Sequence, residues 1–180
     1  MNPVGQKMRH WTRWLLEIAA IIALLLAVNA WQTRDAPTGP APAFSGMLLD
    51  GTPVSLAELR GRPALLHFWA TWCPICGLEQ GTVDAIAGDY QVIAVAMDEA
   101  PTEEIRAYMK EKAVDYPVIH DRDLAISRQY AIRGVPTSYI LDADGNIRFV
   151  EMGFTTGIGL RFRLWWAGLR FPQEYRNGRP

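Results

Sequence analysis

Residues 63–76 read PALLHFWATWCPIC, and this stretch decides the fold. Its first half, 64–70, is a near-continuous apolar run that is typical of a strand buried on both faces. Residues 76–87 favour a helix, so the strand delivers Cys73 to the start of that helix. Free backbone N–H groups and the helix dipole favour a thiolate there. The stretch therefore predicts a reactive sulfur at a strand-to-helix junction.

The two cysteines of the chain, Cys73 and Cys76, stand three positions apart. A structural disulfide stabilises a fold more when it closes a longer loop, and this pair would close almost none. The pair is better explained by redox chemistry or by metal binding. A tetrahedral zinc site would need two further ligands, which the sequence does not offer.

Strand-like and helix-like segments alternate along the chain. Asp50-Gly51 and Asp144-Gly145 each predict the turn of an antiparallel hairpin. Because strands alternate with helices before a closing hairpin and helix, we expect an α/β fold with a central mixed sheet flanked by helices. The expected strands are 64–70, 91–97, 117–119, 137–141 and 147–151, and the expected helices are 76–87, 102–112, 124–130 and 157–169.

A long apolar segment precedes the domain. Residues 15–31 read LLEIAAIIALLLAVNAW, close to the ~17–25 residues that a membrane-spanning helix needs. Trp14 precedes the segment and Trp31 closes it, as in the aromatic belts of a bilayer. Residues 1–14 are basic, so the positive-inside rule places them in the cytoplasm and the domain outside. We therefore expect a single-pass transmembrane signal-anchor over 15–31.

A cleaved signal peptide is the alternative to an anchor. Val28-Asn29-Ala30 is a tolerable cleavage site. The flanking tryptophans favour the anchor, because they would serve no purpose in a discarded peptide. Either alternative exports the domain to a compartment where disulfides persist.

The remaining chain divides by composition. Residues 32–43 are rich in proline and predict an extended linker, 44–172 form the expected domain, and 173–180 form a tail. The formal net charge is −1, with no stripe of basic residues that could neutralise phosphates, so nucleic acid is excluded as a partner.

Two motifs give the chain a family resemblance. The run DGTPVSLAELRGRPALLHFWATWCPIC (50–76) and Gly134-Val135-Pro136-Thr137 follow one another in the expected order. With them the chain resembles the thioredoxin superfamily, in particular its exported TlpA- and ResA-like branch and there the ScsD-type membrane-anchored oxidoreductases. The resemblance covers about 44–170 and implies a thioredoxin-like fold preceded by one transmembrane helix.

The resemblance also implies an activity and a location. The chain would be a protein thiol–disulfide oxidoreductase, anchored in a bacterial inner membrane with its catalytic domain in the periplasm. Its substrates would be protein thiols and disulfides, its electron-transfer partner a membrane protein of the DsbD type, and its redox centre the Cys73–Cys76 disulfide, with no other cofactor and no metal.

Individual residues receive roles from the same resemblance. Cys73 would be the nucleophile and Cys76 the resolving thiol. Pro136 would be a cis-proline packed against the disulfide, rather than an ordinary trans turn proline, and Val135 would offer backbone hydrogen bonds to an extended substrate. Trp72, Pro74 and Ile75 surround Cys73 and would contact the substrate.

Two titratable residues are further catalytic candidates. Glu79 matches an acid that ResA-like proteins place near the active site; the alternative is a solvated carboxylate. His67 stands where thioredoxin carries a buried acid that moves the proton of the resolving thiol. A buried imidazole could do the same, or His67 could be a structural strand histidine. Pro74 and Ile75 carry no charge, so the direction of electron flow stays open.

The spacing of the cysteines and their neighbours helps to weigh other functions of this fold. Two thiolates could hold Cu(I), although copper-handling relatives of this fold use Cys-x-x-x-Cys and a distant histidine. A peroxidase of the peroxiredoxin kind is disfavoured, because Thr71 stands only two positions before Cys73. Cytochrome c maturation is an alternative physiological role for the same redox pair.

The last expected helix is basic and aromatic. It contains Arg161, Arg163 and the pair Trp165-Trp166. We expect it either to pack on the sheet with its arginines outside or to rest on an anionic membrane surface near the anchor.

Overall fold

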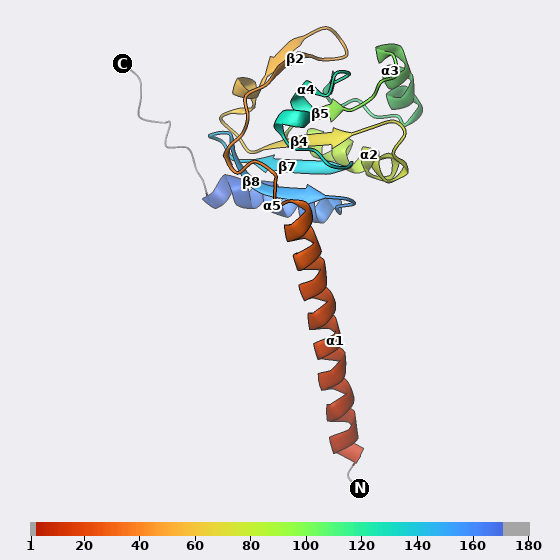
Figure 1. Ribbon diagram of the computed structural model, residues 1–180, viewed down its shortest axis with the longest axis vertical. Helices are drawn as coiled ribbons and strands as arrows, with labels where there is room; N and C mark the ends of the chain where they lie inside the picture. Colours follow the sequence, from red (N-terminus) through yellow and green to blue (C-terminus); the bar gives the residue numbers. More distant parts are fainter. Residues whose placement is uncertain (1–2, 171–180) are drawn as a thin grey trace, which may run out of the picture. The chain divides into compact units, whose positions relative to one another are not determined.

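A computed structural model describes residues 3–170 and divides the chain into two compact units, 1–34 and 35–180. The first unit contains helix α1 (Pro3–Gln32), labelled in Figure 1. Its part from Arg13 to Gln32 is long and apolar enough to cross a membrane, a test that a signal sequence also passes. Trp14 and Trp31 are exposed on this helix.

The second unit is built on a six-stranded mixed sheet with the order β1-β8-β7-β4-β5-β6. Figure 1 labels its four inner strands, β8, β7, β4 and β5, in this order. The strands β4, β5 and β6 run parallel, whereas the pairs β4–β7, β7–β8 and β1–β8 are antiparallel. The expected α/β fold with a central mixed sheet is thus confirmed. The strands are β1 (Gly39–Pro40), β4 (Ala64–Trp69), β5 (Gln91–Ala96), β6 (Val118–His120), β7 (Thr137–Leu141) and β8 (Asn146–Met152).

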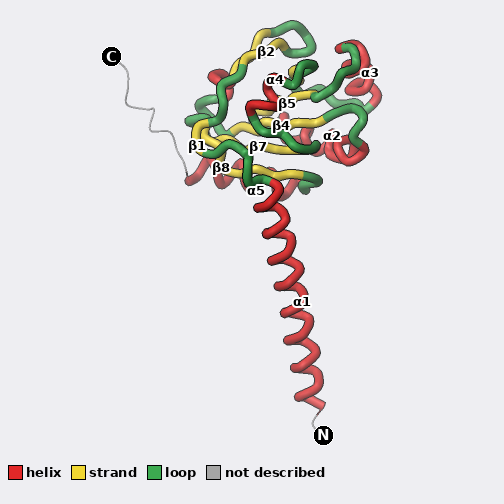
Figure 2. Tube along the Cα trace, viewed as in Figure 1, coloured by secondary structure: helices red, strands yellow, loops and turns green. Residues whose placement is uncertain are grey.

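The remaining elements lie outside this sheet. Figure 2 colours the helices red, the strands yellow and the loops green. A separate hairpin pairs β2 with β3 around the expected Asp50-Gly51 turn. The elements are β2 (Ser45–Met47), β3 (Pro53–Ser55), the 3-10 turn η1 (Leu56–Leu59) and the helices α2 (Pro74–Ala87), α3 (Thr102–Glu111), α4 (Ala125–Gln129) and α5 (Gly157–Arg170).

The central strand β4 separates two hydrophobic cores. Side chains alternate along a strand, so Leu65 and Trp69 enter the core that α2, α3 and α5 share. Leu66 and Phe68 enter the other core, under η1 and α4. All six residues of β4 are buried, as the apolar run predicts for a strand covered on both faces.

The chain enters the sheet earlier than expected. Gly39 and Pro40 form β1, with Gly39 opposite Ile147 of β8, and Ala41 is buried in a core. Within the predicted extended linker 32–43, residues 39–40 therefore form a strand, because they pair with the edge of β8. The tail 173–180 and the last two residues of the predicted domain, 171–172, lie outside the described residues.

Candidate active site

The junction between β4 and α2 carries the two cysteines. Cys73 is the N-cap of α2, and Cys73 and Cys76 form a disulfide with their Cα atoms 5.3 Å apart. The backbone N–H of Cys76 donates a hydrogen bond to Sγ of Cys73 across 3.2 Å. Cys73 is 5% exposed, whereas Cys76 is fully buried. The sulfur of Cys73 therefore meets the helix N-terminus, as the sequence predicts, and it is the one nearer to solvent.

Apolar side chains surround the cysteine that is nearer to solvent. Trp72 is 67% exposed and Ile75 is 47% exposed, and Pro74 opens α2 as its first residue. Exposed aromatic and aliphatic groups of this kind suit contact with another protein chain. The three residues predicted to contact a substrate thus lie at the accessible rim of the disulfide.

The loop before β7 lies against the disulfide. The peptide bond between Val135 and Pro136 is cis, as the family resemblance implies. The carbonyl oxygen of Val135 lies 3.5 Å from Sγ of Cys73. The carbonyl of Pro136 accepts a hydrogen bond of 2.8 Å from the backbone N–H of Gly153. Residues more than sixty positions apart in sequence are therefore brought to one sulfur atom.

Glu79 is buried, not solvated. It lies on α2, one turn after Cys76, and its carboxylate accepts a hydrogen bond from the backbone N–H of Thr155. Removal from water raises the pKa of Glu79 to about 7, although the Thr155 N–H favours the charged form. The expected alternative of a solvated carboxylate is wrong, and Glu79 can take up or release a proton near neutral pH.

His67 is buried on β4. Its Nδ1 atom lies 2.9 Å from Oγ of Ser138, and its Nε2 atom is buried without a hydrogen-bond partner among the described residues. Burial lowers the pKa of His67 to about 4, because a charged imidazole would lose its hydration. Successive side chains of a strand point to opposite faces, and Leu66 and Phe68 enter the core under η1 and α4. His67 therefore faces the other core, which contains Cys76. The ring is therefore neutral at neutral pH.

Three functional candidates were missed in the sequence. Asp98 is buried after β5, and its carboxylate accepts hydrogen bonds from the N–H of Thr71 at 2.9 Å and its hydroxyl at 2.7 Å. Thr155 holds Glu79, and Phe154 beside it is 58% exposed. Asp98 had a usable signal, because the carboxyl ends of adjacent parallel strands meet at one edge of a sheet. No local pattern marks Phe154 or Thr155.

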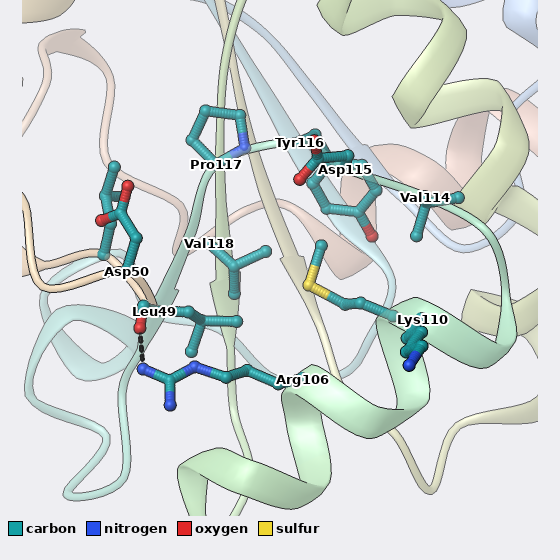
Figure 3. A pocket seen from close by; sticks show the side chains of 11 residues that line it. Leu49, Asp50, Arg106, Lys110, Val114, Asp115, Tyr116, Pro117 and Val118 are labelled. Carbon is teal, nitrogen blue, oxygen red and sulfur yellow. Dashed lines mark hydrogen bonds between the residues drawn. The ribbon is translucent and has the colours of Figure 1, made fainter.

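Other possible sites lie apart from the cysteines. Among residues 3–170, no group of three or more His, Cys, Asp and Glu side chains is placed to hold a metal ion. A hollow of about 560 Å³ lies between α3 and β6, where Arg106 donates a hydrogen bond to the carbonyl of Leu49 (Figure 3). None of its lining residues belongs to the predicted site.

Comparisons with known proteins give a consistent result. The AhpC/TSA family matches residues 37–150. The chain is 28% identical to the thiol-disulfide oxidoreductase ResA of Halalkalibacterium halodurans over 164 residues, 85% of this chain and 92% of the relative. It is 34% identical to the thioredoxin-like protein YneN of Bacillus subtilis over 122 residues, 64% of this chain and 71% of the relative.

A solved structure agrees with these sequences. The crystal structure of a thiol:disulfide interchange protein of the thioredoxin family from Chlorobium tepidum superimposes with a TM-score of 0.65 at 30% identity. The superposition covers 74% of this chain and 98% of that chain. The matched part therefore includes a complete domain of this architecture.

Proposed function

Since the chain belongs to the AhpC/TSA family of thioredoxin-like proteins and is a thiol–disulfide oxidoreductase, we propose that Cys73 and Cys76 carry out its reaction. We further propose that the reaction takes place at a membrane surface outside the cytoplasm. One observation carries the proposal. The Cys73 sulfur lies at the start of α2 and 3.5 Å from the carbonyl oxygen of Val135, beside the only cysteine that can resolve a mixed disulfide.

The reaction proceeds by two exchange steps when the chain acts as a reductant. The Cys73 thiolate attacks one sulfur of a substrate disulfide, which forms a mixed disulfide and releases the other substrate sulfur as a thiolate. The Cys76 thiolate then attacks Cys73 Sγ, which closes the Cys73–Cys76 disulfide and releases the second substrate thiolate. The substrate disulfide gains two electrons that the cysteine pair loses. The reverse sequence oxidises a substrate dithiol.

The rim of the site provides the substrate contacts. Trp72, Pro74 and Ile75 cover the approach to Cys73, and their exposure supports contact with an extended chain. The backbone of Val135 would pair with that chain, while Pro136 keeps the loop against the disulfide. Phe154 extends the same apolar rim, because its neighbours Gly153 and Thr155 bind Pro136 and Glu79.

Two buried groups would handle the proton of Cys76. Cys76 is fully buried, so its thiol cannot lose a proton directly to bulk water. Glu79 lies one turn further along α2 with a pKa of about 7, which suits proton exchange near neutral pH. His67 lies on the same side of β4, and its Nε2 atom, which has no hydrogen-bond partner within the described range 3–170, offers a second acceptor.

Helix α1 supports a location for the domain. The segment Arg13–Gln32 and the basic residues before it support a single-pass anchor in a bacterial inner membrane, with the domain in the periplasm. A membrane reductase of the DsbD type would then supply electrons, as expected for an ScsD-type protein. Cytochrome c maturation is an alternative use of the same chemistry.

A redox titration of residues 35–180 tests the proposal. The Cys73–Cys76 pair would be equilibrated in glutathione or dithiothreitol buffers while the fluorescence of Trp72, next to Cys73, reports its state. A potential near roughly −270 mV indicates a reductase, and one near about −120 mV indicates an oxidant that makes disulfides. A pair without a reversible two-electron transition would refute the oxidoreductase and leave Cu(I) binding by the two thiolates as the function to test.

A separate measurement tests the location. Full-length protein should remain in the membrane fraction after carbonate extraction, and an impermeant thiol reagent should reach reduced Cys73 from the periplasmic side. Release of a shorter soluble protein would mean that the segment 15–31 is a cleaved signal.

A further inference from the structure

Helix α5 presents a second apolar face to solvent, opposite the face that packs in the core. Leu160, Leu164 and Ala167 are buried against the sheet, as expected for the inner side of a helix in this position. The outer side would normally be polar. Here its large side chains are apolar and between 38% and 84% exposed: Ile158, Phe162, Trp165, Trp166 and Leu169.

These five side chains form one continuous stripe. Each residue turns a helix by about 100°, so positions separated by four, seven, eight and eleven residues lie along one side. The aromatic rings also pack against one another. The centroid of the Phe162 ring lies 5.8 Å from that of Trp165 and 6.1 Å from that of Trp166. A contiguous exposed apolar stripe of this extent marks an interaction surface.

Arginines mark both borders of the stripe. By the same helical geometry Arg161 lies along one edge and Arg163 along the other. Arg161 pairs with Asp89 and Arg163 pairs with Glu151, and these contacts hold the two guanidinium groups at the edges. Residues 152–170 contain three arginines and no acid. An apolar face rich in tryptophan and bordered by arginine is the pattern of a helix that lies in a bilayer interface.

The position of the expected anchor in the chain indicates which partner the stripe contacts. Residues 33–38 join the end of α1 to β1, which pairs with β8. A segment of this length spans at most about 25 Å even when fully extended. If α1 anchors the chain, the domain cannot leave the lipid surface by more than this distance. The bilayer is then always within reach of the stripe, so its effective concentration is high. A second protein would first have to diffuse to the domain.

We propose that the stripe Ile158–Leu169 lies in the interface of the phospholipid bilayer, with Arg161 and Arg163 at the level of the lipid phosphates. This inference rests on the anchoring part of the proposed function, and it adds a second attachment that fixes how the domain faces the membrane. The stripe begins at Ile158, shortly after the Thr155 N–H that binds Glu79. Since α5 is about 21 Å long, docking holds the disulfide close to the lipid surface.

Residues 35–180 can be used alone to test this. Every buried residue of the two cores lies between Ala41 and Ala167, so the described part of α1 contributes none to the interior of the domain. The domain would be mixed with vesicles of phosphatidylglycerol and phosphatidylethanolamine, or of phosphatidylcholine, and the bound fraction measured by sedimentation. We expect binding to both kinds of vesicle, and tighter binding to the anionic ones.

Uncharged substitutions isolate the contribution of the stripe. The double variant Phe162→Gln, Trp165→Gln should bind anionic vesicles at least about tenfold more weakly, because the removed side chains no longer enter the interface. The matched control is Met47→Gln, which replaces a side chain that is 56% exposed on the separate hairpin and should bind like the wild type. The redox potential of the double variant should equal that of the wild type, which shows that its fold is intact.

Each other outcome overturns the proposal. A domain that binds neither kind of vesicle has no interfacial face, whatever the full chain does through α1. Undiminished binding by the double variant would assign any attraction to another part of the domain. A domain that forms dimers, which the double variant abolishes, would assign the stripe to a second copy. None of these results depends on the anchor or on the redox reaction, so a failure here is distinguishable from a failure of the proposed function.

Discussion

His67 lies opposite Ser138 on adjacent antiparallel strands, and its Nδ1 atom is 2.9 Å from the serine oxygen. This contact uses one ring nitrogen and leaves Nε2 buried without a partner among residues 3–170. Burial lowers the pKa of His67 from 6.5 to about 4. A neutral imidazole on the side of the sheet that faces Cys76 is thus a feature of the folded state, with consequences for stability.

The first prediction concerns His67→Asn, which keeps an amide near the position of Nδ1. Between pH 6.5 and 4 the unfolded chain binds a proton at His67 that the folded chain does not, so this residue makes stability fall as the pH falls. In the wild type this residue should lower the free energy of unfolding by about 3 kcal/mol as the pH falls over this window, and the variant should lack that decrease. Urea denaturation between pH 4 and 7.5 measures the difference. Parallel curves for the variant and the wild type would mean that His67 titrates normally.

The second prediction concerns Glu79→Gln and has the opposite sign. The folded chain keeps a proton on Glu79 up to a pH of about 7, whereas the unfolded chain releases it near 4.5. This residue therefore makes stability fall as the pH rises from 4.5 to 7, by about 3 kcal/mol. Glu79→Gln should lack this fall.

The control for Glu79→Gln is Glu104→Gln, which changes an exposed carboxylate on α3 and should follow the wild type. The oxidoreductase rate offers a second readout. If Glu79 exchanges the proton of Cys76, its removal should abolish an inflection near pH 7 in the rate profile. An unchanged rate profile together with a changed stability profile would make Glu79 structural alone.

Local motifs explain what could be predicted from the sequence. The strand, the Cys-x-x-Cys pair and the helix after it are adjacent in the chain, so their geometry follows from short-range rules. The cis peptide bond before Pro136 was implied by a four-residue motif. Each element of the sheet was expected within a few residues of its observed bounds except β1, whose two residues pair only because the edge of β8 is available.

Long-range contacts explain what could not be predicted. The burial of Glu79 depends on the Thr155 N–H, 76 positions later, which no periodicity in α2 reveals. The roles left open for His67 depend on which residue faces it across β7, and this register is set by the whole strand pair. No local motif distinguishes Asp98, which follows a predicted strand. Only the pairing of adjacent parallel strands places its side chain beside Thr71.

The third prediction concerns Asp98→Ala. Asp98 accepts two hydrogen bonds from Thr71, which stands just before Trp72 and Cys73. Removal of the carboxylate leaves both donors without it, so we expect unfolding to become easier by about 2 kcal/mol. The matched control is Glu99→Ala, an exposed neighbour that should change stability by less than about 0.5 kcal/mol. Equal stability of the two variants would show that Asp98 does not hold the loop.

The fourth prediction separates the roles of the two cysteines. Since Cys73 is the more exposed sulfur and Cys76 is fully buried, only Cys73 should form mixed disulfides with substrates. Cys76→Ser should therefore accumulate covalent complexes in living cells, visible on non-reducing gels after acid quenching and released by dithiothreitol. Cys73→Ser should form none and lose all turnover, and the Cys73→Ser, Cys76→Ser double variant is the matched control for other covalent species. Complexes that form with Cys73→Ser but not with Cys76→Ser would exchange the two roles, because the attacking sulfur would then be the buried one.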